Sequence, residues 1–181
     1  STDADYLTVG ANITVSGLGV SSSGNAADLP AGAELTISDE SVATLQDGTL
    51  TGLSLGSVTI NLELDGEILG SKTVQVVQPD GLNFTRDGVN AVYGSEVALP
   101  IEATYNGNPV AISVNDVTFE LSTASAGIIE GFSFIGDESS GVRNVTVTAM
   151  LTKDYSVSDT MTIALYKNGE AIFDFDTAMA G

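Results

Sequence analysis

Two carboxylates stand one residue apart near the end of the 181-residue chain, at Asp174 and Asp176 on either side of Phe175. In an extended strand, residues two apart point to the same face, so these carboxylates would lie side by side. Hard cations such as calcium bind through several oxygen atoms, carboxylate oxygens among them. The spacing therefore allows a calcium site at Asp174 and Asp176, and calcium is the one cofactor we consider. The alternative is an outward acidic face, with Phe173 and Phe175 in the core.

Tyrosines offer a second kind of chemistry, because the ring packs against the C–H face of a sugar while the hydroxyl supplies a polar contact. Tyr105 stands just before an Asn-Gly turn, and Tyr155 lies in the segment KDYSVSD between two long strand-like stretches. We predict Tyr105 and Tyr155 as ligand-binding residues. The alternative is that both belong to the aromatic core that this half of the chain needs. A binding module would expose two or more tyrosines together, whereas a spacer would bury them singly.

Catalytic constellations are scarce in this sequence. It contains no histidine and no cysteine, which excludes Ser–His–Asp and Cys–His catalysis within the chain and removes the usual ligands of zinc and copper. Glycoside hydrolysis needs two carboxyl groups at a set distance. With 24 acidic residues, some pair meets that distance by chance. The polar turn GDESSG, with Asp137 and Glu138, could help bind a cation or a sugar hydroxyl, or could simply be solvated. We expect no enzyme.

The charge balance limits the partners. Five basic residues face 24 acidic ones, which gives a net charge of −19. Such a field repels nucleic-acid phosphates, whose binding depends on clustered Lys and Arg, and it disfavours anionic membrane surfaces. No apolar run approaches the roughly 20 residues that span a bilayer. We expect no nucleic-acid partner and no membrane insertion. The expected partner is a cell-surface or extracellular glycan or protein, and the expected state is a monomer.

The elements that would position these residues are strands. Apolar and polar residues alternate over 57–65 and 145–151, the period of two that a half-buried strand shows. Asn-Gly and Asp-Gly pairs, which suit tight hairpin turns, separate such runs. They occur at Asp47-Gly48, Asp65-Gly66, Asn106-Gly107 and Asn168-Gly169. Because no stretch of a dozen residues carries a capped helical pattern, we predict an all-β fold.

A domain boundary is predicted at VVQPDG, residues 76–81. Pro79 has no backbone N–H to donate to a sheet, and Asp80-Gly81 starts a turn. Composition changes at the same place, because of the 11 aromatic residues only Tyr6 precedes it. Short strands at this spacing predict two tandem β-sandwiches, at residues 1–78 and 80–181.

The stretch ISDESVATLQDGTLTGLSLGSVTINLEL, residues 37–64, resembles the bacterial Ig-like group 2 (Big2) module, and the resemblance covers about residues 1–78. The positions that match the motif are Ser41, Val42, Ala43, Thr44, Asp47, Gly48, Leu50, Thr51, Gly52, Leu53, Gly56, Val58, Thr59 and Ile60. The chain departs from the family at Ser54 and Leu55, where a Lys-Ala or Lys-Pro pair is common. The resemblance implies an Ig-like sandwich without catalytic residues, of the kind found in surface adhesins and beside extracellular enzymes.

The final segment NGEAIFDFDTAMAG resembles Ig-like segments that precede phosphodiester-glycosidase domains in secreted bacterial proteins. With the Big2 resemblance, it implies an excised piece of a larger bacterial protein that is extracellular or associated with the cell wall. We expect a non-catalytic spacer or adhesion segment that positions neighbouring domains. The alternative is a carbohydrate-binding module in residues 80–181 that serves an attached glycan-active enzyme.

Overall fold

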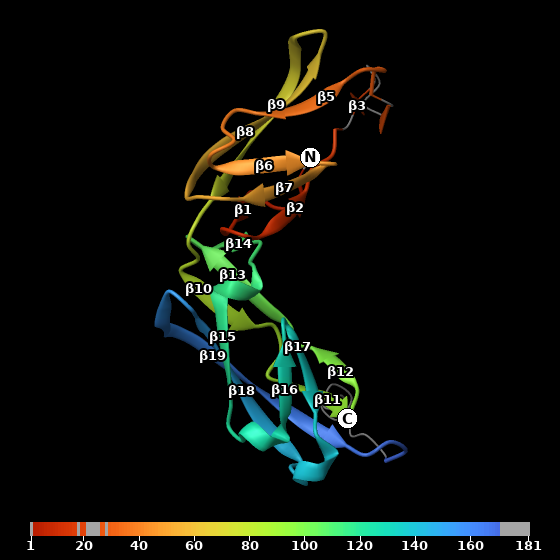
Figure 1. Ribbon diagram of the computed structural model, residues 1–181, viewed down its shortest axis with the longest axis vertical. Coiled ribbons are helices and arrows are strands. Elements are labelled where there is room, and N and C mark those ends of the chain that lie inside the picture. Colours follow the sequence, from red (N-terminus) through yellow and green to blue (C-terminus); the bar gives the residue numbers. More distant parts are fainter. Residues whose placement is uncertain (1, 18, 21–25, 28, 171–181) are drawn as a thin grey trace, which may run out of the picture. The chain divides into compact units, whose positions relative to one another are not determined.

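The computed structural model describes residues 2–17, 19–20, 26–27 and 29–170, and it is built almost entirely of strands, as predicted (Figure 1). Contacts group the chain into two units. The first unit is Ser1–Gly81 with Ala103–Ser113, and the second unit is Leu82–Glu102 with Val114–Gly181. The strands numbered with the first unit are β1 (Tyr6–Leu7), β2 (Asn12–Thr14), β3 (Gly19–Val20), β4 (Ala26–Ala27), β5 (Glu34–Ile37), β6 (Ala43–Gln46), β7 (Thr49–Gly52), β8 (Gly56–Leu64), β9 (Glu67–Val76), β13 (Ile101–Tyr105) and β14 (Asn108–Val110). Those of the second unit are β10 (Gly81–Phe84), β11 (Gly88–Val92), β12 (Glu96–Ala98), β15 (Val117–Leu121), β16 (Gly127–Glu130), β17 (Ser133–Gly136), β18 (Asn144–Leu151) and β19 (Asp154–Tyr166).

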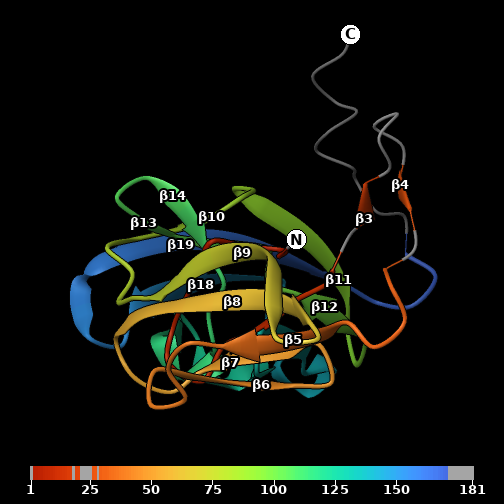
Figure 2. The ribbon, with the colours of Figure 1, turned by 90° about the horizontal axis from the view of Figure 1, so that it is seen from above.

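The first unit is a sandwich of two sheets, with strand orders β1-β9-β8-β5 and β2-β7-β6 (Figure 2). The alternation in the sequence explains its core, because every second residue of a strand points inward. In β8, Val58 and Ile60 are buried, and so are Val74 and Val76 in β9. The rest of this core is Leu7, Ala11, Ile13, Val15, Val42, Ala43 and Leu50.

The second unit repeats this arrangement with strand orders β11-β19-β18-β15 and β12-β17-β16. Taken in chain order, β11, β12, β15, β16, β17, β18 and β19 occupy the places of β1, β2, β5, β6, β7, β8 and β9. Four strands on three, with crossing connections, is the Ig-like arrangement. The prediction of Ig-like β-sandwiches is confirmed, and the topology reveals an internal repeat that the sequence conceals.

In each seven-strand sandwich the first strand, β1 or β11, pairs in parallel with the last, β9 or β19. β1 aligns Tyr6 with Gln75 and Leu7 with Val76. β11 makes a longer pairing over five residues, from Gly88 opposite Thr162 to Val92 opposite Tyr166. A parallel pair cannot be closed by a hairpin, so the strands between β1 and β9, and between β11 and β19, form the connection.

Three of the four predicted hairpin turns have the expected backbone. Asp47, Asp65 and Asn106 have positive φ angles of 48°, 51° and 50°, and the glycines that follow them have 75°, 82° and 76°. Both central residues of a type I′ turn need positive φ, which explains these pairs. At Asn168-Gly169 the expected primed turn geometry is wrong, because only Gly169 has a positive φ, 85°. A tight turn is present, in which the Glu170 N–H donates to the Lys167 carbonyl at 3.0 Å, and the second strand of the predicted hairpin lies outside the described residues.

Residues 103–113 belong with the first unit, although they stand between β12 and β15 in the sequence. The β13–β14 hairpin brings Ala111 beside β1, where the Ala111 N–H donates to the Tyr6 carbonyl at 3.0 Å. The Thr8 N–H donates to the Ala111 carbonyl at 2.9 Å. The edge of the first sheet is therefore extended by a distant segment of chain. Whether residues 1–78 and 80–181 are separate folding domains stays a prediction.

Core packing gives the first test. Leu50 is fully buried in the first unit, whereas Leu69 is 48% exposed. Leu50→Ala should lower the free energy of unfolding of the first unit by about 2–5 kcal/mol, because it removes buried methyl groups and leaves a cavity. Leu69→Ala, the matched control, should change it by less than about 0.5 kcal/mol. Urea denaturation followed by circular dichroism measures both, and equal losses would contradict the assigned core.

The inserted hairpin gives the second test. A fragment of residues 1–81 lacks the strand that pairs with Tyr6 and Thr8, so it should be less stable than the same residues in the whole chain. Amide hydrogen exchange at Val58 and Val74 should therefore be faster in the fragment. A synthetic peptide of residues 103–113 in excess should slow it again, because a ligand of the native state stabilises that state. Equal exchange in fragment and chain would show that the hairpin adds nothing.

Candidate functional site

The structure assigns the two predicted ligand-binding tyrosines to different units. Tyr105 ends β13 in the first unit and is half-buried. Tyr155 begins β19 in the second unit and is 60% exposed. The two are not brought together within one sandwich, so each stands as a separate prediction. Asp174 and Asp176 lie outside the described residues, and their calcium site stays a prediction.

Tyr105 lies in a shallow groove of the first unit with a volume of about 350 Å³, which we call the Tyr105 groove. Its lining residues are Leu55, Gly56, Gln75, Val76, Val77, Gln78 and Tyr105. Val76 and Val77 are buried, whereas Leu55, Gln75 and Gln78 are exposed. The groove therefore has apolar residues fixed in the core and two amide side chains that reach solvent.

Several contacts hold the Tyr105 ring in place. The ring of Tyr6 in β1 lies against it, with centroids 5.7 Å apart and planes tilted by 50°. The carbonyl of the preceding residue, Thr104, accepts from the Asp80 N–H at 2.9 Å. The carboxylate of Asp80 in turn accepts from the Asn106 N–H at 2.8 Å. Because the backbone is held on both sides of Tyr105, the ring is pre-positioned in the groove.

Around Tyr155 the backbone is also held, and Tyr155 lines neither of the two grooves described in this section. The Asp154 carboxylate accepts from the Ser156 hydroxyl at 2.6 Å and from the Ser156 N–H at 3.0 Å. These hydrogen bonds, the one from the hydroxyl first, lower the pKa of Asp154. Tyr155 is thus an exposed ring on a segment whose backbone is held by the Asp154 carboxylate.

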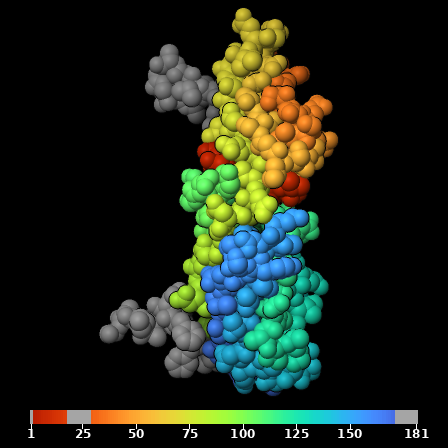
Figure 3. Space-filling view, turned by 90° about the vertical axis from the view of Figure 1, so that its left-hand side faces the viewer, coloured from red at the N-terminus to blue at the C-terminus, as the bar shows by residue number. Residues whose placement is uncertain are grey.

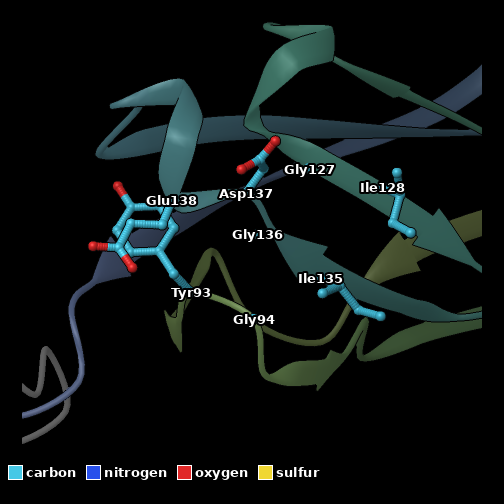
Figure 4. Close-up of a pocket in the computed structure, with 8 residues that line it drawn as sticks. All are labelled: Tyr93, Gly94, Gly127, Ile128, Ile135, Gly136, Asp137 and Glu138. Carbon is cyan, nitrogen blue, oxygen red and sulfur yellow. The ribbon is translucent and has the colours of Figure 1, made fainter.

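A second groove, about 410 Å³ in volume, lies in the second unit and is drawn in Figure 4; we call it the Tyr93 groove. It is lined by Tyr93, Gly94, Gly127, Ile128, Ile135, Gly136, Asp137 and Glu138. Its polar groups already have partners. The Tyr93 hydroxyl donates to the Val142 carbonyl, and the Glu138 carboxylate lies 3.1 Å from the Lys167 ammonium.

Asp137 and Gly136 of the Tyr93 groove have structural explanations. The Asp137 carboxylate accepts from the Ser139 N–H at 2.8 Å, and hydrogen bonding to Ser139 lowers the pKa of Asp137. A Cβ on Gly136 would come within 2.6 Å of the Leu165 Cδ2 atom, so a larger residue there would force the buried Leu165 side chain to shift. Asp137 and Glu138 were predicted to lie in a polar turn. In the structure, Asp137 caps a short 3₁₀ helix at Glu138–Ser140, and Glu138 forms an ion pair with Lys167.

The tip of the β8–β9 hairpin is a third exposed feature, and it projects beyond the rest of the first unit (Figures 1 and 3). Ile68 is 60% exposed and Leu69 48% exposed there. Lys72 on the same strand pairs with the Asp5 carboxylate at 2.5 Å. The sequence pattern did not predict that β9 extends beyond the sandwich. Ile68 and Leu69 are adjacent apolar residues, which interrupts the alternation of apolar and polar positions.

Among the described residues, no group of three or more histidine, cysteine, aspartate or glutamate side chains could hold a metal ion. Within the same residues, no helix is long and apolar enough to cross a bilayer.

The Tyr105 groove contains residues that the sequence analysis did not select. Gln75 follows the buried Val74 and precedes the buried Val76, so the period of two predicts that it points outward. That signal identifies an exposed amide but not its neighbours. Leu55 and Tyr105 are distant in sequence, and only the docking of the β13–β14 hairpin explains their presence in one groove.

Comparisons with known proteins find similarity in structure only. No protein-family model matches the sequence, and no curated protein matches it. Domains 1–6 of the surface layer protein SbsC match with 13% identity and a TM-score of 0.47, over 94% of this chain and 26% of that one. Invasin, described as a bacterial integrin-binding protein, matches with 16% identity and a TM-score of 0.33, over 99% of this chain and 42% of that one. Human mucin-like protocadherin EC1-2 matches with 14% identity and a TM-score of 0.31, over 92% and 98%.

These matches are loose, and nothing about the activity of those proteins is carried over from them. The predicted resemblance to the Big2 family has no matching family model behind it. It therefore stays a prediction, while the Ig-like arrangement stands on the strand order of the structure itself.

The last described turn is held by an ion pair that gives a pH-dependent test. Arg143 donates to both carboxylate oxygens of Glu170, at 2.6 and 2.9 Å, and the Lys167 N–H donates to the same carboxylate at 2.7 Å. The hydrogen bond from Arg143, followed by that from Lys167, lowers the pKa of Glu170 from its ordinary 4.5 to about 2.

A carboxylate with a lowered pKa stabilises the folded state above its ordinary pKa and loses that effect as the pH falls through the lowered value. The melting temperature of the native chain should exceed that of Glu170→Gln at pH 7, and the difference should shrink between pH values of about 4.5 and 2. Because Glu170 is exposed, the difference should be small and should fall with added salt. Glu67→Gln, at an exposed position of β9, is the control. A constant difference from pH 7 to pH 2 would contradict the ion pair.

Proposed function

We propose that this chain is a non-catalytic segment of a larger bacterial protein, secreted or associated with the cell wall, that positions neighbouring domains and carries tension between them. The observation that carries the proposal is the parallel pairing of the first and last strands in both units. The absence of histidine and cysteine from the sequence supports a role without catalysis.

The parallel pairing matters because of where force acts. When the chain is pulled from its ends, the beginning of β11 and the end of β19 move apart. In a parallel pair these two points lie at opposite ends, so the strands slide past each other. All the hydrogen bonds of the pair are then loaded together, whereas a hairpin pulled open loses them one at a time. Five residue pairs join β11 to β19 and two join β1 to β9.

Single-molecule pulling of the whole chain from its two ends tests this proposal. We expect two unfolding events, with the second unit unfolding at the higher force because more residue pairs are loaded in it. Proline variants of β11 locate the resistance. The Tyr93 N–H donates to the Tyr166 carbonyl, and the Asp87 carbonyl accepts from the Thr162 N–H, so the backbone groups of both residues point toward β19. Because backbone direction alternates along a strand, the N–H groups of residues 89 and 91 also point toward β19.

Val89→Pro removes an N–H that faces β19, whereas Val92→Pro removes one that faces away, and both valines are half-buried. Val89→Pro should lower the unfolding force of the second unit, and Val92→Pro should leave it nearly unchanged. Equal effects of the two variants, or no force difference between the units, would refute the proposal that this pairing carries tension.

The second candidate function is a carbohydrate-binding module that serves an attached extracellular glycan-active enzyme. One observation favours binding of a sugar: Tyr105 lies in a groove with two exposed amide side chains. This residue falls within the predicted region 80–181, but its groove belongs to the first unit.

A further inference from the structure

We propose that the Tyr105 groove is a binding site for a neutral glycan, with the Tyr105 ring as the apolar platform and the amides of Gln75 and Gln78 as hydrogen-bonding partners of sugar hydroxyls. The proposal rests on the second candidate function, the carbohydrate-binding module, and names its residues and its class of ligand. The tension-bearing part does not depend on it, so either can fail while the other stands.

The groove has the two kinds of surface that bind a sugar, an apolar aromatic ring and hydrogen-bonding side chains. A pyranose presents C–H groups on its faces and hydroxyls around its rim. An aromatic ring covers the face, and side chains that both donate and accept hydrogen bonds suit the hydroxyls. Tyr105 supplies the ring, and Leu55 extends the apolar surface. Each glutamine amide has two donor hydrogens and an acceptor oxygen, so either can bind a hydroxyl in either sense.

The two amides are available for a ligand. Gln75 and Gln78 are exposed, and no side-chain hydrogen bond from either to another described residue is present. Their backbones are anchored, because the Gln75 N–H donates to the Asp5 carbonyl at 3.0 Å and Val77, next to Gln78, donates to the Leu7 carbonyl at 2.8 Å. A ligand would therefore have to order two glutamine side chains, which costs entropy, but it would not have to order the backbone.

Charge selects a neutral ligand. None of the seven residues that line the Tyr105 groove is charged, although the chain carries 24 acidic residues. The Tyr93 groove differs, because two of its eight lining residues are carboxylates. A basic peptide would be favoured at the Tyr93 groove and would find no countercharge among the lining residues of the Tyr105 groove. A neutral polar molecule needs no countercharge in the groove, and its binding does not require a charge to be removed from water.

The test is a glycan array probed with the whole chain, followed by calorimetric titration of each hit with the corresponding soluble oligosaccharide. Uncharged oligomers of glucose, xylose, mannose, galactose and N-acetylglucosamine are the expected hits. Tyr105→Ala should raise the dissociation constant by at least about tenfold, the size of effect that loss of a stacked ring produces. Tyr155→Ala removes an exposed tyrosine from the other unit and should change it by less than about twofold.

Tyr105→Ala also removes the contact with Tyr6, so a second variant keeps the test independent of folding. Gln78→Ala changes only an exposed side chain and should weaken binding about three- to tenfold through a lost hydrogen bond. Gln46→Ala, at an exposed position of β6, is its matched control and should have no effect. Silence across the array would overturn the proposal. So would binding that Tyr155→Ala abolishes and Gln78→Ala leaves intact, or hits confined to charged glycans.

Discussion

The parallel pairing of the first and last strands is the constraint on which both units depend. Neighbours in sequence cannot make it, because two parallel strands need a connection that returns the chain to its starting end. In each unit, that connection consists of all the remaining strands of the sandwich. The pairing therefore joins the two ends of the whole sandwich rather than two neighbouring strands. In the second unit the pairing spans β11 fully, whereas in the first unit β1 offers only two residues.

The position of β1 at the edge of its sheet explains why the first unit uses residues from elsewhere in the chain. A two-residue edge strand leaves backbone groups of Tyr6 and Thr8 without partners in its own segment, and a buried N–H without a partner is costly. Thr8 is 1% exposed, and its N–H is satisfied by Ala111. The hairpin that supplies Ala111 is inserted between β12 and β15 of the second unit, so the chain passes between the two units three times. The stability of the first unit thus depends on sequence that follows it.

This dependence marks the limit of what the sequence could predict. Local signals worked: the alternation predicted β8 and β18, while Asp47-Gly48 and Asp65-Gly66 predicted the β6–β7 and β8–β9 turns. A tight turn can be predicted in this way because it is decided by its own residues. The seven-strand repeat and the docking of Ala111 on β1 depend on pairings far apart in sequence, which leave no local pattern. Tyr105 could be selected for its chemistry, but no local pattern placed it beside Gln75 rather than beside the other aromatic residues of its half.

The position of Tyr105 connects these points. One side of its ring packs against Tyr6, a contact that helps fix the β13–β14 hairpin on the first unit, and the same ring lines the groove. The groove therefore exists only while the hairpin is docked. A ligand that binds it would stabilise the docked state by mass action, since it has no comparable site when the hairpin is released. Conversely, anything that pulled the hairpin from β1 would dismantle the groove. Adhesion through this groove and the completion of the first sandwich are thus linked through one side chain, and each would strengthen the other.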